Sequence, residues 1–249
     1  MAKERTYWLI GLGIALLTLS LLLLGIHYAI FKDMYWIEEY VVFELAFLPI
    51  EVIVVTLILD RLLAWRERKE RLEKMNMVIG LFFSEVGVAF LRKVASRDSE
   101  IEKIRDRLAH AGDLPQEEYM RLKAVLADFK YSPEMRVDDL AAIKKDLNDR
   151  RGFLVRLLEN PILIEHEKFT NALQAMFHLT EELDYRGDFH ELPQTDIVHL
   201  NGDVKRAYSL LVLEWIRYMG YLKTHYPYLF SLAMRINPFN QETSPIVKT

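Results

Sequence analysis

The chain has 249 residues, a formal net charge of -4 and no cysteine. The lack of cysteine excludes a disulfide framework and a thiolate zinc site, and the length allows one sizeable domain beside a membrane segment. Glycine and proline are sparse at 10 and 8 residues, and long stretches are rich in Leu, Glu, Lys, Arg and Ala. This composition favours helices over sheets, so we predict an all-α fold.

The first apolar stretch covers residues 7–30 and is interrupted only by Thr18, Ser20 and His27. As a helix it is long enough to cross a bilayer core of about 30 Å. A cleaved signal peptide is the alternative, but its apolar core is about 7–15 residues long and ends at small residues. This stretch is longer and ends in aromatic residues, so we predict a retained membrane span.

A second apolar stretch, residues 41–64, contains Glu44 and Glu51. The connector between the two stretches is short and aromatic, so residues 1–65 are expected to form a transmembrane hairpin with its rings in the headgroup layer. Basic residues flank the outer ends of this hairpin, and the cluster after the second span consists of Arg66, Arg68, Lys69, Arg71 and Lys74. The positive-inside rule therefore predicts an inner or plasma membrane protein with both termini in the cytoplasm.

The second span is predicted to continue as a juxtamembrane helix over residues 66–96, because no proline or strong stop precedes Ser96. Its apolar part, residues 75–91, needs a cover from the rest of the chain or from another subunit. Residues 97–236 are predicted to form a cytoplasmic helical domain, followed by a disordered tail over residues 237–249. We expect its helices over residues 100–110, 115–130, 137–159, 162–185 and 195–224, and a short aromatic helix that ends near residue 235.

Glu44 and Glu51 lie seven residues apart, so they share one helix face about 10 Å apart along the axis. A carboxylate in mid-membrane costs on the order of 2.5 kcal/mol unless it is paired, protonated or hydrated. A ring of subunits around a water-filled cavity would hydrate these acids and attract cations. The sequence therefore predicts a homo-oligomeric, ion-conducting or gated pore, with lipid and cations as partners. The alternative is a packing device in an oligomeric scaffold or sensor that has no chemistry of its own.

The segment IRDRLAHAG contains Arg105, Asp106 and His110 in the pattern R-D-x-x-x-H. This pattern resembles the motif of HEPN domains, which are helical and often cut RNA. The resemblance implies a membrane-tethered ribonuclease in which Arg105 and His110 of two subunits form a composite site. There a histidine acts as general acid or base, and an arginine stabilises the developing charge on the phosphate. Alternatively, these residues form the polar end of a helix, where a histidine is favourable near the C-terminus.

A second group of polar side chains lies on either side of the last helical hairpin. His178 and Glu182 precede its loop, and Asp196, His199 and Asp203 follow it at i, i+3 and i+7. If these two faces oppose each other, two imidazoles and up to three carboxylates converge. Such a set can bind Zn²⁺, Mn²⁺ or Fe²⁺. The alternative is a solvated, charged hairpin tip, because the spacing matches no established metal motif.

No other motif assigns a cofactor or an enzyme class. The sequence has no Gly-rich phosphate loop, no dinucleotide fingerprint and no Ser-His-Asp arrangement with a recognisable turn. The aromatic residues between Trp215 and Phe230 are expected to form core or subunit contacts. The net negative charge argues against a nucleic-acid partner.

Overall fold

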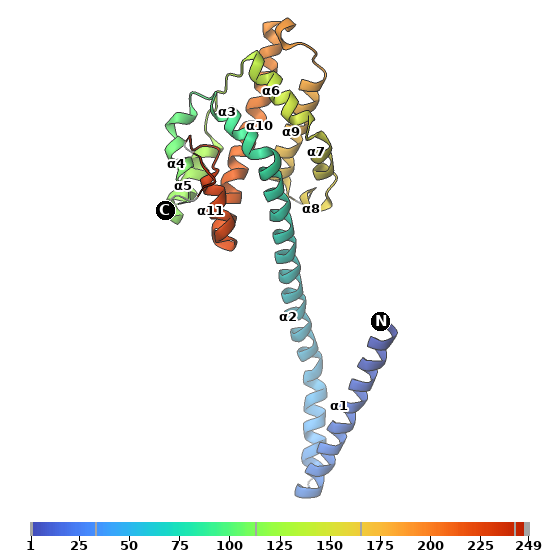
Figure 1. The fold of residues 1–249 in the computed structure, drawn as a ribbon. Coiled ribbons are helices and arrows are strands. Elements are labelled where there is room, and N and C mark those ends of the chain that lie inside the picture. Colours follow the sequence, from blue (N-terminus) through green and yellow to red (C-terminus); the bar gives the residue numbers. More distant parts are fainter. Residues whose placement is uncertain (1, 33, 113, 165, 242, 247–249) are drawn as a thin grey trace. The chain divides into compact units, whose positions relative to one another are not determined.

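The computed structural model contains helices throughout, and the all-α class is confirmed (Figure 1). Within the part of the chain that it describes there is no strand, and one isolated β-bridge pairs Asp98 with Pro133. The chain divides into two compact units, Met1–Glu67 and Arg68–Thr249. The structure describes residues 2–32, 34–112, 114–164, 166–241 and 243–246.

The first unit contains helix α1 (Ala2–Phe31) and the beginning of helix α2 (Met34–Phe82). Helix α1 ends at Phe31, because the next residue, Lys32, has a left-handed φ of 51° that does not continue the helix. The best apolar window of Gly13–Phe31 has a mean hydropathy of 2.2 and that within Ile37–Ala95 has 2.4, and no side chain in either window is buried. Two helices are therefore long and apolar enough to cross a membrane, by length and composition.

Helix α2 is followed directly by a π-helical turn, η1 (Phe83–Gly87), and by helix α3 (Val88–Ala95). The helical path therefore extends to Ala95, as the lack of a stop before Ser96 predicts. A π turn is a rare local widening of the helix. The segment predicted as a separate juxtamembrane helix, residues 66–96, is not a unit of its own. From Arg68 onward it belongs to the second compact unit.

The other helices of the second unit differ from the predicted ranges mainly by breaks. The break between α6 and α7 falls where Asn148 and Asp149 disfavour a helix interior and Arg150 Nη1 donates to the carbonyl oxygen of Asp146 at 3.2 Å. Helix α9 has its own start, because the ring of His166 accepts a hydrogen bond from Phe169 N at 3.0 Å. The elements are η2 (Ile101–Lys103), α4 (Arg105–Ala109), α5 (Gln116–Ala127), α6 (Val137–Asn148), α7 (Arg151–Leu158), α8 (Pro161–Ile164), α9 (Glu167–Asp184), η3 (Phe189–Glu191), α10 (Gln194–His225) and α11 (Pro227–Arg235).

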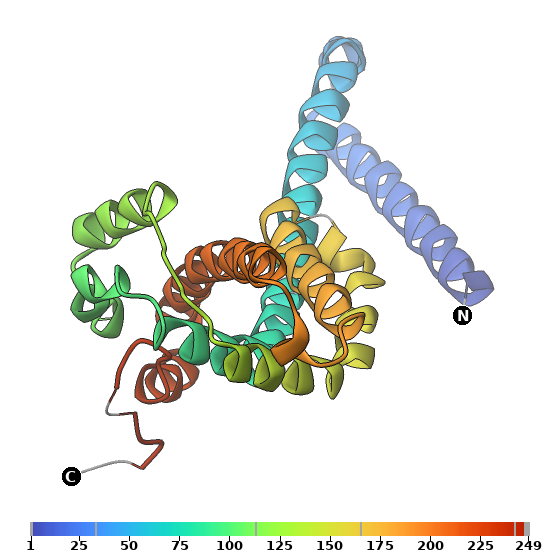
Figure 2. The ribbon, with the colours of Figure 1, turned by 90° about the horizontal axis from the view of Figure 1, so that it is seen from above.

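Helix α10 is the central element of the second unit, and it packs against α9, α3, α5 and α11. Figure 2 shows it between α9 on one side and α5 with α11 on the other. The ring of Phe83 contacts those of Trp215 and Tyr218 on α10, at centroid distances of 5.1 and 5.5 Å, and Phe82 contacts Phe169 on α9 at 5.3 Å. The apolar stretch predicted to need a cover is thus buried by helices of its own chain.

The start of the C-terminal tail is ordered, so the prediction of disorder over residues 237–249 is wrong there. The side chain of Asn237 is 1% exposed and that of Phe239 is fully buried. Asn237 Nδ2 donates to the carbonyl oxygen of Leu108 at 3.0 Å and to that of the next residue at 3.2 Å. Carbonyl oxygens in the last turn of a helix lack the usual donor four residues on, so an amide side chain can bind there. Residues 247–249 lie outside the described part of the tail.

Candidate metal centre

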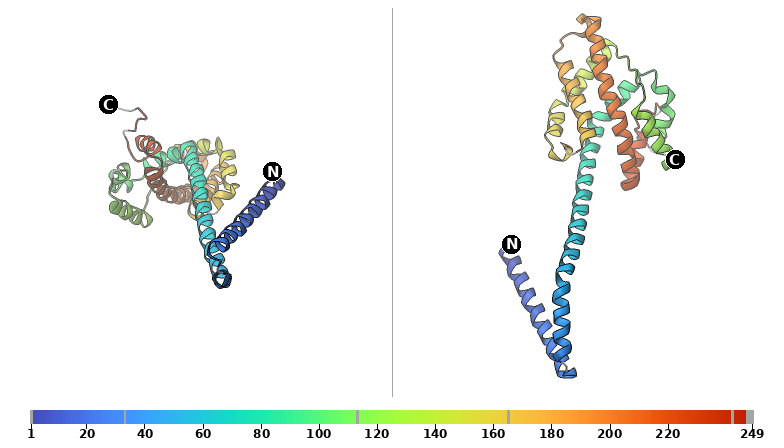
Figure 3. Two further views of the ribbon diagram at one scale, coloured as in Figure 1. Left: turned by 90° about the horizontal axis from the view of Figure 1, so that it is seen from below. Right: turned by 180° about the vertical axis from the view of Figure 1, so that it is seen from behind.

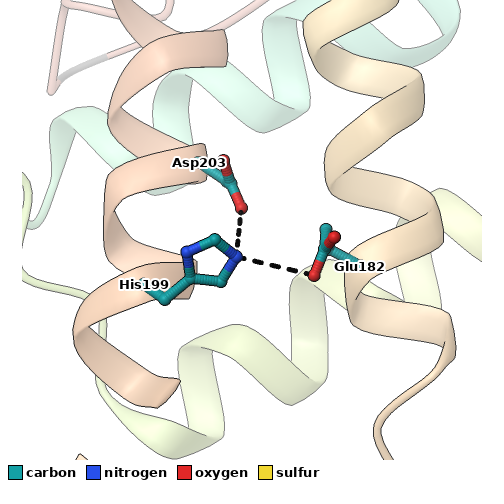
Figure 4. Close-up of side chains that lie close together, drawn as sticks. All are labelled: Glu182, His199 and Asp203. Carbon is teal, nitrogen blue, oxygen red and sulfur yellow. Dashed lines mark ion pairs between the residues drawn. The ribbon is translucent and has the colours of Figure 1, made fainter. Parts of the chain in front are cut away.

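The candidate site lies on the antiparallel hairpin of α9 and α10, which Figure 3 shows side by side in its right-hand view. Residues four apart on a helix lie on one face. His178 and Glu182 therefore share a face of α9, and His199 and Asp203 share a face of α10. These two faces oppose each other, as the sequence analysis required for a metal site, and Figure 4 shows three of the side chains pointing toward one another.

Each imidazole faces one oxygen of each carboxylate. His199 Nε2 lies 3.3 Å from Asp203 Oδ2 and 3.6 Å from Glu182 Oε2. His178 Nε2 lies 3.8 Å from Asp203 Oδ1 and 3.9 Å from Glu182 Oε1. All four distances exceed the range of about 2.7–3.2 Å that is typical of protein hydrogen bonds. The groups are therefore close to one another without hydrogen bonds between them.

These separations match the edges of a metal coordination shell. Zinc lies about 2.0–2.2 Å from nitrogen and oxygen ligands, so two ligands at a tetrahedral angle are about 3.4 Å apart. One ligand atom each from Glu182, His199 and Asp203 lies within 4.8 Å of the others. A single ion fits among these three atoms after small side-chain movements, and His178 is close enough to serve as a neighbouring group.

Asp203 is the least compensated group of this cluster. Its side chain is 3% exposed, and among the described residues Oδ2 has no hydrogen-bond donor. Arg206 is the nearest guanidinium, with Nη2 3.5 Å from Oδ1. A buried carboxylate without hydrogen bonds costs on the order of several kcal/mol. A cation bound at Oδ2 would offset this cost.

Arg186 forms hydrogen bonds with the other two carboxylates of the cluster, those of Glu182 and Asp196. It donates from Nε and Nη2 to both oxygens of Asp196 at 2.8 and 2.9 Å, and from Nη1 to Glu182 Oε2 at 2.6 Å. These hydrogen bonds lower the pKa values of Glu182 and Asp196 below their ordinary range. Asp196 is therefore an anchor for Arg186, whereas the sequence analysis had grouped it with the metal ligands.

Arg186 was not among the predicted site residues, although the sequence contains a signal for its ion pair. Arg186 follows Glu182 by four residues, a spacing that favours an ion pair on a helix. With both histidines neutral, three carboxylates and the two guanidinium groups of Arg186 and Arg206 leave one net negative charge in the cluster. This charge balance favours one bound cation over two.

The residues of the predicted ribonuclease site lie elsewhere in the second unit. Arg105 donates to the carbonyl oxygens of Ala95 at 3.1 Å and Phe239 at 3.3 Å, and it pairs with Glu102 at 2.8 Å. His110 is exposed after the end of α4. These contacts give the guanidinium a role in joining α3, α4 and the C-terminal segment.

The two acids of the predicted pore both lie on α2, in the first unit. Glu44 is half-buried and Glu51 is exposed. The two carboxylates lie on the same face because their spacing is close to two helical turns. The structure of one chain leaves open what covers this face.

Two family models match the chain, one to each unit. The model of the N-terminal helical domain of MJ1433 matches residues 3–63, and that of the C-terminal helical domain of the uncharacterized protein MJ1433 matches residues 71–235. The division between the two units falls between these matches.

The protein MJ1433 of Methanocaldococcus jannaschii is 41% identical to this chain over 241 residues, which are 97% of the chain and 96% of MJ1433. No solved structure matches the chain. Because one relative matches nearly end to end and a family model covers most of the second unit, the chain belongs to the MJ1433 family.

Proposed function

We propose that the chain is a two-span membrane protein whose second unit lies in the cytoplasm and binds one divalent transition-metal ion. Glu182, His199 and Asp203 are the ligands, and His178 is a fourth ligand or a partner of the bound water. The observation that carries the proposal is the buried Asp203 Oδ2, which lacks a hydrogen-bond donor in the described chain and faces His199 Nε2 at 3.3 Å.

The ligand set indicates the class of metal. Imidazole together with carboxylate oxygens suits Zn²⁺, Mn²⁺ and Fe²⁺, and the absence of thiolates disfavours Cu⁺ and iron–sulfur clusters. Three protein ligands leave a coordination position open to water, unlike a closed structural site. The side chain of His199 is 53% exposed, so the ion can exchange with solution. Such a site fits a metal sensor in which the ion joins α9 to α10.

The test is metal binding by the full-length chain, purified in detergent and stripped of metal with a chelator. Calorimetric titration with Zn²⁺ and with Mn²⁺ is expected to show one ion per chain for at least one of them. Loss of an outer partner of a ligand costs about 10–100-fold in metal affinity, so His199→Gln is expected to cost at least about 100-fold. His225→Gln is the matched control, because His225 is an exposed histidine on the same helix.

Two results of this titration would contradict the proposal. One is that neither ion binds the unaltered chain. The other is that His199→Gln and His225→Gln bind metal as tightly as the unaltered chain does. Circular dichroism of each variant separates a lost ligand from a lost fold.

The membrane topology is supported by the two apolar helices and by the basic cluster that follows the second of them. Because the chain has no cysteine, single cysteines report topology without background. An impermeant thiol reagent added to intact cells is expected to label Glu38→Cys, in the connector, and to leave Ser99→Cys unlabelled. The reverse pattern, or equal labelling, would show that the orientation is wrong.

A homo-oligomeric pore remains a second proposal for the first unit. It is supported by the two acids on one face of an apolar stretch of α2, of which no side chain in the apolar window is buried in the single chain. Ion flux into reconstituted vesicles is the measurement. Flux that is unchanged when Glu44→Gln and Glu51→Gln are combined would contradict this role.

A further inference from the structure

Apart from the candidate metal site, the second unit has a cleft between helices α5 and α10 with a volume of about 240 Å³. The two helices approach closely at Gly220, because the hydroxyl of Tyr119 lies where a Cβ atom on Gly220 would be. This hydroxyl donates a hydrogen bond to the carbonyl oxygen of Ile216. The missing side chain therefore lets Tyr119 form one wall of the cleft.

The cleft is lined by basic side chains from both helices. Lys123 comes from α5, and Arg217 and Lys223 come from α10. Among the described lining residues there is no carboxylate. A cleft lined by charges of one sign has a strong local electrostatic potential. Three cations and no acid among the described lining residues therefore favour an anionic ligand.

Two of the three cations already have partners. Arg217 pairs with the buried carboxylate of Glu214, and Lys223 Nζ donates to the carbonyl oxygens of Gly112 at 2.5 Å and Leu114 at 3.4 Å. These contacts hold both side chains in place at the cleft. The carboxylate of Glu214 offsets the charge of Arg217, whereas the charge of Lys223 is not neutralised, because carbonyl oxygens carry no net charge.

Lys123 is the cation available to a ligand. Its side chain is half-buried, and no carboxylate lies within ion-pair distance of it in the described part of the chain. Its ammonium group lies 5.7 Å from the centroid of the Tyr119 ring. Burial, and next the positive charges of Arg217 and Lys168, lower the pKa of Lys123 below its ordinary range. Because the two positive neighbours act in the same direction as burial, and Glu214 acts against them, a bound anion would stabilise the charged form of Lys123.

We propose that the cleft between α5 and α10 binds the phosphate group of a small molecule or of a lipid headgroup. Lys123 is the direct ligand of the phosphate, since an ammonium group binds phosphate as a point charge. The volume exceeds that of one phosphate and approaches the lower end of about 300 Å³ for small-molecule pockets. Organic atoms attached to the phosphate therefore have space beside the ring of Tyr119.

The test uses the full-length, metal-free chain in a phosphate-free detergent buffer. Inorganic phosphate and short-chain phosphatidic acid are titrated separately, so that a soluble phosphate and a headgroup are distinguished. Lys123→Gln is expected to lower the affinity for the probe that binds by at least about 10-fold, because one charge-assisted hydrogen bond is lost. Lys123→Arg is expected to retain most of the affinity, and Lys130→Gln, an exposed lysine just after α5, is expected to change nothing.

The proposal is overturned if neither probe binds the unaltered chain, or if Lys123→Gln binds as tightly as Lys130→Gln. Arg217 is avoided as a test position, because its loss would leave Glu214 buried without its cation. An unchanged melting temperature shows that Lys123→Gln is folded. The inference is independent of the metal site, so phosphate binding is expected to persist in His199→Gln.

Discussion

Saturating Zn²⁺ is expected to raise the melting temperature of the metal-free protein by about 5–11 °C. A ligand that binds only the native state adds about 2.7 kcal/mol at 100 times its dissociation constant. For a domain of this size, each kcal/mol shifts the melting temperature by about 2–4 °C. The physical source of the gain is the buried carboxylate of Asp203, whose Oδ2 acquires a cation. Differential scanning calorimetry with and without chelator measures the shift.

The variant Asp203→Asn distinguishes a metal ligand from a structural ion-pair partner. Without metal, the amide removes a buried negative charge that has no hydrogen-bond donor at Oδ2, so the variant is expected to melt no lower than the unaltered metal-free protein. With Zn²⁺, the variant is expected to lose the stabilisation. If Asp203 instead stabilised the hairpin through His199 and Arg206, the variant would melt lower under both conditions, and the metal site would be excluded.

Arg186→Met is expected to lower the free energy of unfolding by about 2–4 kcal/mol. Arg186, Glu182 and Asp196 have side chains that are 17%, 26% and 26% exposed, so the ion pairs are shielded from solvent. Each charge-assisted hydrogen bond contributes about 1.5–3 kcal/mol, and the two carboxylates lose their cation together. Denaturant unfolding followed by circular dichroism measures the change.

A matched control for this substitution is Arg156→Met on α7, where the arginine is exposed. Its effect is expected to stay within about 0.5 kcal/mol, as is usual for surface positions. Equal effects of Arg186→Met and Arg156→Met would show that the Arg186 ion pairs add nothing to stability.

The ion pairs of Arg186 are expected to make the free energy of unfolding depend on pH. Arg186 lowers the folded-state pKa values of Glu182 and Asp196 below their ordinary values of 4.5 and 3.8. This contribution to stability is therefore present above about pH 4.5 and is lost as the pH falls through the lower folded-state values. Between pH 6 and pH 3, the unaltered protein is expected to lose more unfolding free energy than Arg186→Met does. Parallel curves for the two proteins would contradict this assignment.

The sequence predicts much of the proposed metal site because helical spacing is a local property. The i, i+4 spacing of His178 and Glu182, and of His199 and Asp203, places each pair on one face. A short connection between two helices makes them antiparallel neighbours, so the two faces meet. The spacing does not distinguish Asp196 from Asp203, because that depends on which carboxylate the guanidinium of Arg186 reaches.

The parts of the fold that the sequence analysis missed depend on contacts between distant residues. Asn237 is polar and follows the last helix, so its local sequence resembles that of a disordered tail. Its order comes from hydrogen bonds to the carbonyl oxygens at the end of α4, more than a hundred residues earlier in the chain. The break before Arg151 is a different case, because the poor helix formers Asn148, Asp149 and Gly152 gave a local signal that was not used.

The π turn Phe83–Gly87 sets the rotational phase of everything that follows it in the helix. Each residue of an α-helix advances by about 100° around the axis, and a π turn accommodates one residue more than an α turn does. The π turn therefore absorbs one extra residue while the face that carries Leu91 and Val94, both fully buried, stays directed at the core. Deleting one residue between Phe82 and Val88 is thus expected to restore a regular α-helix, whereas inserting a further residue would rotate the following helix by about 100°.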